Sequence, residues 1–84
     1  MNIKLRYFSW IRVKLKKSHE LIELNQPISF KELKNNLIYK DPIFQEIFKD
    51  ESIKYFLNLS ELDNENQTLN NGDILAFLPP VTGG

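Results

Sequence analysis

The residues best suited to chemistry are the last two, Gly83 and Gly84, which follow an apolar segment at residues 74–78 and the pair Pro79-Pro80. Glycine has no Cβ, so a diglycine can enter a channel that is too narrow for any other residue. We expect the free α-carboxylate of Gly84 to be delivered to the active site of another protein. The prolines fix φ at about −65° and favour a stiff, extended tail. The alternative is a frayed terminus or a cloning remnant.

The other side chains offer little chemistry. The sequence contains no cysteine, which excludes disulfides, thiolate metal sites and a cysteine nucleophile. His19 is the one histidine and is expected on the surface of a strand, because a metal site needs companion ligands. Glu46, Asp50 and Glu51 are expected on solvated helix exteriors and turns. We therefore predict no metal site and no catalytic side chain.

Length, composition and charge indicate one small domain. With 84 residues, of which 42% are hydrophobic, the chain is long enough for a single core. The formal net charge is zero, so nucleic acid is not an expected partner. The short basic run Lys14, Lys16 and Lys17 is expected in a solvated loop. The sequence has no apolar run of membrane-spanning length and no signal-peptide pattern, so we expect a cytoplasmic protein without a membrane partner.

The N-terminal third predicts a β-hairpin. Apolar and polar residues alternate over residues 2–8 and 19–25, which is typical of half-buried strands. Residues 9–12 are expected to form a short turn of helix between them.

Two helices are predicted in the middle of the chain. Ser29 and Glu32 have the spacing of a capping box, in which each side chain binds a backbone amide of the other residue. Asp41 is expected at the cap of the second helix and Pro42 at its first helical position. The apolar residues of the two helices recur at the helical period, as Phe30, Leu33, Leu37 and Ile38, then Ile43, Phe44, Ile47 and Phe48.

The C-terminal third predicts two further strands. Ile53, Tyr55, Leu57 and Leu59 alternate along residues 53–59, and a polar turn at residues 70–73 precedes the strand at 74–78. The order of elements predicts an α+β fold, with a mixed sheet of four to five strands and helices packed on one face. A hairpin, a helix and a returning C-terminal strand favour a β-grasp topology.

The last strand is apolar on both faces. Leu75 and Phe77 lie on one face, and Ile74, Ala76 and Leu78 on the other. Because helices cover one face of such a sheet, we expect one set to stay partly exposed as a partner patch beside the tail. The alternative is burial under a loop.

The segment from Asn71 to Gly84, NGDILAFLPPVTGG, resembles the C-terminal signature of the molybdopterin synthase small-subunit family. The start of the chain is also similar to that family, with KLRYF at residues 4–8 followed by Arg12. Asn58 stands where the family's third strand carries an asparagine. The resemblance covers the whole chain. The departures lie outside the tail, for example Phe77-Leu78 in place of an aromatic pair, and they concern the partner surface.

The resemblance implies a ubiquitin-like β-grasp domain at residues 1–78 and an extended tail at residues 79–84. In that family the C-terminal glycine, here Gly84, is adenylated by an activating enzyme that uses ATP and is converted to a thiocarboxylate. The large subunit of a heterotetrameric synthase then receives the tail, and sulfur passes to cyclic pyranopterin monophosphate. The chain itself would be non-catalytic and would bind no cofactor. The implied channel-binding residues are Pro79, Pro80, Val81, Thr82 and Gly83, and the implied partner-binding residues are Phe8, Arg12 and Leu78.

Three other functions remain open at this stage. A sulfur carrier for thiazole synthesis in the thiamin pathway also ends in diglycine. A ubiquitin-like modifier shares the activation chemistry but is attached to lysines of its targets. An inert binding module would carry the tail by accident. Phe8 as a core residue is likewise an alternative to Phe8 on a partner face.

Overall fold

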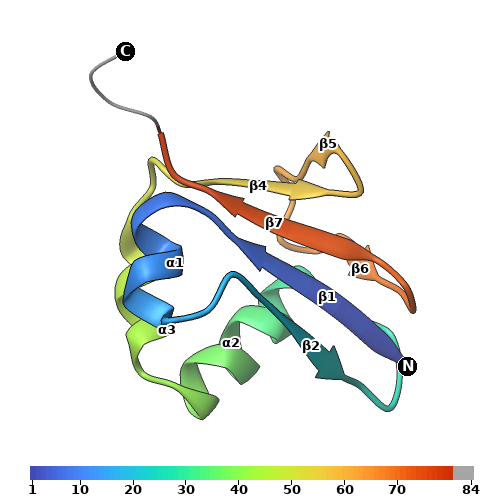
Figure 1. Ribbon diagram of the computed structural model, residues 1–84. Helices are drawn as coiled ribbons and strands as arrows, with labels where there is room; N and C mark the ends of the chain where they lie inside the picture. The colour runs from blue at the N-terminus through green and yellow to red at the C-terminus, as the bar shows by residue number, and fades with distance from the viewer. Residues whose placement is uncertain (81–84) are drawn as a thin grey trace.

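The computed structural model describes residues 1–80, and Val81 to Gly84 lie outside the described residues. Within that part, a five-stranded sheet has the order β2-β1-β7-β4-β5 and a small two-stranded sheet has the order β3-β6 (Figure 1). The strands of the large sheet are β1 (Asn2–Tyr7), β2 (His19–Glu23), β4 (Lys54–Leu57), β5 (Ser60–Glu61) and β7 (Ile74–Leu78); those of the small sheet are β3 (Ile28–Ser29) and β6 (Thr68–Leu69). This arrangement confirms the predicted α+β class and β-grasp topology.

The two central strands of the large sheet come from opposite ends of the chain. β1 and β7 are parallel, with Leu5 beside Leu75 and Tyr7 beside Phe77. Both other neighbours are antiparallel, β2 to β1 and β4 to β7. Because β1 and β7 run in the same direction, the chain enters α1 and leaves β7 at the same end of the sheet (Figure 1).

One face of the sheet is covered by the helices α1 (Ser9–Leu15), α2 (Phe30–Lys40) and α3 (Ile43–Lys49) (Figure 1). The predicted capping box opens α2: the Glu32 N–H donates to Ser29 Oγ at 3.1 Å, and the Ser29 N–H donates to the Glu32 carboxylate at 3.4 Å. Together these bonds satisfy two amides that lack partners within the helix. Of the predicted stripe, Phe30, Leu33 and Leu37 are buried.

Aromatic rings fill the space between the helices and the sheet. Phe77 is fully buried, and its ring centroid lies 5.2 Å from that of Tyr7 and 5.2 Å from that of Tyr55. Phe48 from α3 packs at 5.8 Å from Phe77. These edge-on and tilted contacts are the geometries that aromatic pairs favour. The covered side of the sheet, here called the inner face, therefore holds the core.

Two predicted boundaries in the N-terminal third were wrong. The first helix does not end at Arg12 but continues to Leu15, because Ile11 and Leu15 are one turn apart and both are buried. Lys14 consequently lies on a helix and pairs with Glu46 of α3 at 2.7 Å. The second strand ends at Glu23 and not at residue 25.

The start of α3 also differs from the prediction. Ile43 is its first helical residue, so Pro42 precedes the helix. Asp41 still serves the helix start, because its carboxylate accepts the Ile43 N–H at 3.1 Å.

The strand predicted at residues 53–59 is shorter than expected. β4 ends at Leu57, and Leu57 pairs with Ser60 across a turn. Asn58 and Leu59 form this turn with φ values of 50° and 76°. Leu59, which was predicted to continue the strand in phase with Tyr55 and Leu57, lies in the turn and is 97% exposed.

No helix among residues 1–80 combines the length and the apolar character that a membrane crossing would need.

Candidate functional site

The candidate site lies on the outer face of the sheet, opposite the helices. Along β7, Leu75 and Phe77 are fully buried, whereas Ala76 and Leu78 are half-buried and Ile74 is 42% exposed. Strand residues alternate between faces, so this pattern follows directly from the pleat. It confirms the prediction that one apolar set of the last strand stays partly exposed.

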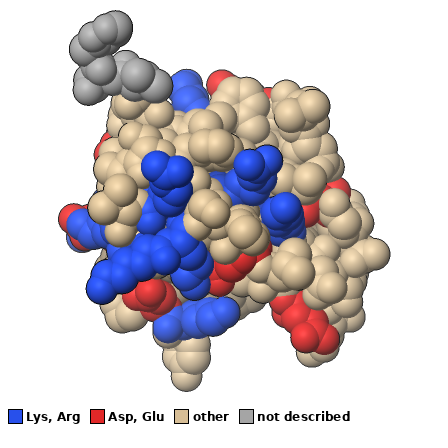
Figure 2. Space-filling model, in the orientation of Figure 1, with Lys and Arg blue, Asp and Glu red and all other residues tan. Residues whose placement is uncertain are grey.

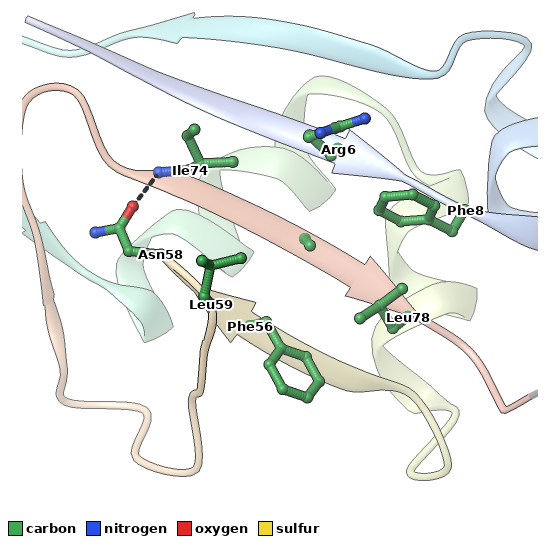
Figure 3. A pocket seen from close by; sticks show the side chains of 8 residues that line it. Arg6, Phe8, Phe56, Asn58, Leu59, Ile74 and Leu78 are labelled. Carbon is green, nitrogen blue, oxygen red and sulfur yellow. Dashed lines mark hydrogen bonds between the residues drawn. The ribbon is translucent and has the colours of Figure 1, made fainter.

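These outward residues line a groove of about 540 Å³ (Figure 3). Most of its lining is apolar. The lining residues are Arg6, Phe8, Phe56, Asn58, Leu59, Ile74, Ala76 and Leu78, and the name outer groove is used for this set.

Strand register explains the shape of the outer groove. Ala76 lies between Arg6 of β1 and Phe56 of β4. Its methyl side chain is short and forms the floor of the groove, and the larger side chains of Phe8, Phe56 and Leu78 surround it (Figure 3). The result is a concave apolar surface, which is the usual form of a binding site.

Asn58 fixes one end of the outer groove to β7. Its backbone N–H donates to the Ile74 carbonyl at 2.9 Å, and its side-chain oxygen accepts the Ile74 N–H at 2.9 Å. Its side-chain amide donates to the Asp73 carboxylate at 2.9 Å. Three hydrogen bonds therefore hold the β4–β5 turn against the start of β7; the bond from Ile74 is drawn in Figure 3.

Positive charge borders the groove on the β1 side. The Arg6 guanidinium lies 5.4 Å from the centre of the Phe8 ring, within range of a cation–π interaction. Figure 2 shows that basic side chains gather on the half of the visible face that carries β1 and α1. The groove is thus an apolar surface with a cationic edge.

The structure brings together two of the three predicted partner-binding residues. Phe8 and Leu78 line the outer groove, and Phe8 is half-buried there. Arg12 is exposed on α1 and does not belong to the groove lining. The partner-binding roles of all three stay predictions.

The base of the predicted tail directly follows the groove. Pro79 is buried and Pro80 is exposed. The other predicted tail residues, Val81, Thr82, Gly83 and the reactive Gly84, lie outside the described residues.

Several groove residues were missed in the sequence. Phe56 carried a usable signal, because it is an apolar residue out of phase with the inward residues Tyr55 and Leu57 of the same strand. Arg6 had a weaker signal as the polar neighbour of Phe8. Leu59 had no such signal, since the alternation of residues 53–59 grouped it with Tyr55 and Leu57 and not with Phe56.

The perturbed tyrosines belong to the core and not to the groove. Burial, followed by the hydrogen bond that its hydroxyl donates to Glu20, raises the pKa of Tyr7 far above its usual range. Burial also raises the pKa of Tyr55. Perturbed groups often mark active sites, but here packing of the core accounts for both. Among residues 1–80, no cluster of three or more His, Cys, Asp or Glu side chains could hold a metal ion.

The fold and the groove define a small ubiquitin-like β-grasp protein. Its structure superposes on small archaeal modifier protein 1 from Haloferax volcanii with a TM-score of 0.82, at 18% identity and with all of both chains covered. The ThiS family model matches residues 5–84, and the chain belongs to the ThiS family. It is a ubiquitin-like sulfur carrier of the type shared by that family and the small subunits of molybdopterin synthases.

Two further solved structures are complexes. A chain of the complex of subunits 1 and 2 of the molybdopterin-converting factor from Helicobacter pylori is 30% identical to this chain, with a TM-score of 0.69 and all of both chains covered. A chain of the BexX/CysO complex from Amycolatopsis orientalis is 18% identical, with a TM-score of 0.70, and 98% of this chain and 99% of that chain are covered. These relatives are found in complex with a second protein. No curated protein sequence matches the chain significantly.

Proposed function

We propose that this chain is the sulfur-carrier small subunit of a molybdopterin synthase. Its tail would carry sulfur on the C-terminus of Gly84 to cyclic pyranopterin monophosphate. The observation that carries the proposal is the 30% identity to a chain of the Helicobacter pylori molybdopterin-converting factor complex over the full length of both chains. The outer groove beside the tail supports it, because a carrier needs a docking surface next to its reactive end.

The reaction uses the backbone terminus and no side chain of this chain. A carboxylate is a poor acyl donor, so an activating enzyme first joins the Gly84 carboxylate to the AMP part of ATP and releases pyrophosphate. Sulfide equivalents then displace AMP and leave a terminal thiocarboxylate. Its sulfur is nucleophilic at neutral pH and bonds to the pterin precursor. Water then cleaves the bond between the Gly84 acyl carbon and the sulfur, so that the sulfur stays on the precursor and the terminus returns to a carboxylate. The chain binds no cofactor of its own in this scheme.

The outer groove is the docking surface for the large subunit. Phe8 and Leu78 would be buried there, with Arg6 facing an acidic group of the partner. Arg12 lies apart on α1 and would contact either the large subunit or the adenylating enzyme. Pro79 to Gly83 would pass into the large subunit, so that the synthase assembles as a cytoplasmic heterotetramer.

The first test concerns Gly84. A variant with one alanine added after Gly84 should fold normally and form no molybdopterin. The terminal carboxylate is then one residue further along the tail, and the residue that bears it has a Cβ. Thiocarboxylate is measured as the mass change of one oxygen-to-sulfur exchange, and molybdopterin is measured after mixing with the large subunit from the same organism. Normal molybdopterin formation by the extended chain would disprove the proposal.

A substitution at Gly83 tests whether the tail enters a narrow channel of the large subunit. Gly83→Val adds a β-branched side chain next to the reactive residue and restricts its backbone. It should leave thermal stability unchanged and abolish transfer. An equal loss of stability and transfer would show that the end of the tail is structural.

A second candidate is the sulfur carrier of thiamin thiazole synthesis, which the match to the ThiS family model favours. The two pathways are separated by complementation. Rescue of molybdoenzyme activity without rescue of thiamin auxotrophy supports the first proposal, and the reverse result supports the second. Isopeptide conjugates to target lysines would identify a modifier instead.

A further inference from the structure

Leu59 occupies a position that its own fold does not explain. Among the large apolar side chains of residues 1–80 it is the most exposed, at 97%. It also has φ of 76° in a turn where Asn58 has φ of 50°. A two-residue hairpin turn with both φ values positive is typically Asn-Gly, because glycine adopts this conformation without strain. A leucine there is strained and gains no burial in return.

The turn is nevertheless held firmly. Asn58 makes three hydrogen bonds to Asp73 and Ile74 at 2.9 Å, as described above. Asp73 is itself fixed, since its carboxylate accepts the Asn70 N–H at 2.7 Å. This arrangement presents the Leu59 side chain at the rim of the outer groove (Figure 3).

We infer that Leu59 is an apolar anchor that enters an apolar pocket of the protein that receives the tail, and that Asn58 is its positioning residue. The inference rests on the proposed function, because the receiving protein is the synthase large subunit. It adds a second contact point to the one at Phe8 and Leu78.

The position of Leu59 relative to the tail indicates that the synthase large subunit is the protein that contacts it. Ile74 lies at the Leu59 end of the outer groove, and Leu78 lies at the end where the tail begins. Four strand steps of about 3.3 Å separate them, a span of about 13 Å. A subunit that takes the tail and covers the groove therefore reaches the Asn58–Leu59 turn. Its surface there should be apolar, with an acidic group on the side that meets Arg6.

The main experiment compares binding with stability for Leu59→Gly. This change produces the Asn-Gly dipeptide that the turn favours, so the melting temperature should stay the same or rise. The dissociation constant for the large subunit from the same organism, measured by calorimetry, should rise about tenfold, as expected for the loss of one buried apolar side chain. Leu59→Asn should behave alike, because asparagine also tolerates positive φ. Unchanged affinity in both variants, or a melting temperature lowered by several degrees in both, would overturn the inference.

Tyr39→Ser is the matched control. Tyr39 is 94% exposed on α2, in the layer opposite the outer groove, and this change should leave the dissociation constant unchanged. A loss of affinity equal to that of Leu59→Gly would mean that any exposed apolar side chain contributes to binding. That result would overturn the inference that Leu59 is an anchor.

A double-mutant cycle tests the role of Asn58. Asn58→Gly keeps positive φ accessible but removes both side-chain hydrogen bonds, so the affinity should fall several-fold. In the Leu59→Gly background the same change should have no further effect on affinity, because the anchor is already absent. A merely structural role would give the same loss in both backgrounds.

Failure of the anchor can be distinguished from failure of the proposed function. If Phe8→Ala and Leu78→Ala weaken binding but the Leu59 variants do not, the anchor role of Leu59 is wrong, and the outer groove remains the docking surface. If the wild-type chain does not bind the large subunit, the proposed function fails and the anchor fails with it.

Discussion

The two faces of β7 carry the same kind of residue for different purposes. Leu75 and Phe77 on the inner face are fully buried under the helices. Ile74 and Leu78 on the outer face are left in contact with solvent along the outer groove. Adjacent residues of one strand thus differ mainly in what covers them.

The difference separates folding from docking. Inner-face side chains lose their contact with water when the chain folds, so their hydrophobic free energy stabilises the domain. Outer-face side chains keep much of that contact, so their hydrophobic free energy is still available when a partner covers them. A substitution on one face should therefore change stability, and a substitution on the other should change affinity.

The largest effect is expected on the inner face. Phe77→Ala removes a ring that packs against Tyr7, Tyr55 and Phe48. It should lower the free energy of unfolding by about 3–5 kcal/mol, the usual loss for a buried phenylalanine. Urea denaturation followed by far-UV circular dichroism measures it. A loss below about 1 kcal/mol would show that the core does not depend on this face.

The next effect is expected on the outer face. Phe8→Ala and Leu78→Ala should each weaken binding to the large subunit by about 1.5–3 kcal/mol, which is about tenfold or more in the dissociation constant. Because both side chains are half-buried, the free energy of unfolding should fall much less than for Phe77→Ala.

The stability of the isolated domain is the control for these two variants. Strong destabilisation with normal binding of the remaining folded protein would place Phe8 and Leu78 in the core. The assignment of folding to the inner face and of docking to the outer face would then be wrong.

The smallest effect concerns the helical cover of the inner face. Ser29→Ala removes the side chain that accepts the Glu32 N–H at 3.1 Å at the start of α2. The free energy of unfolding should fall by about 1 kcal/mol, as is typical for loss of an N-cap. Affinity for the large subunit should not change, since Ser29 is not a groove residue. A weakened affinity would show that the two faces are coupled.

Elements with a local signal were predictable from the sequence. The alternation of residues 2–8 gave β1, and the spacing of Ser29 and Glu32 gave the start of α2. The apolar residues on both sides of β7 predicted an uncovered face, which the structure confirms. Each of these signals depends on neighbours in the sequence, so each can be recognised without knowing the fold.

The Asn58–Leu59 turn could not be predicted, because its cause is not local. The apolar alternation of residues 53–59 favoured a longer strand, and leucine is a poor residue for positive φ. The turn is held by hydrogen bonds to Asp73 and Ile74, about 15 residues away in the chain. The outer groove had the same difficulty, since its residues come from β1, β4 and β7.

The pairing of β1 with β7 has a consequence for how the domain is made. Lys4 lies beside Ile74, so the centre of the sheet joins two segments from opposite ends of the sequence. Such distant pairing slows folding and postpones it until the second segment is available. During synthesis the sheet cannot close until β7 has left the ribosome. A chain that ends before this strand lacks Leu75 and Phe77 of the core, and it lacks the part of the outer groove that β7 supplies. We therefore expect such a truncated chain to stay unfolded and not to compete for the partner.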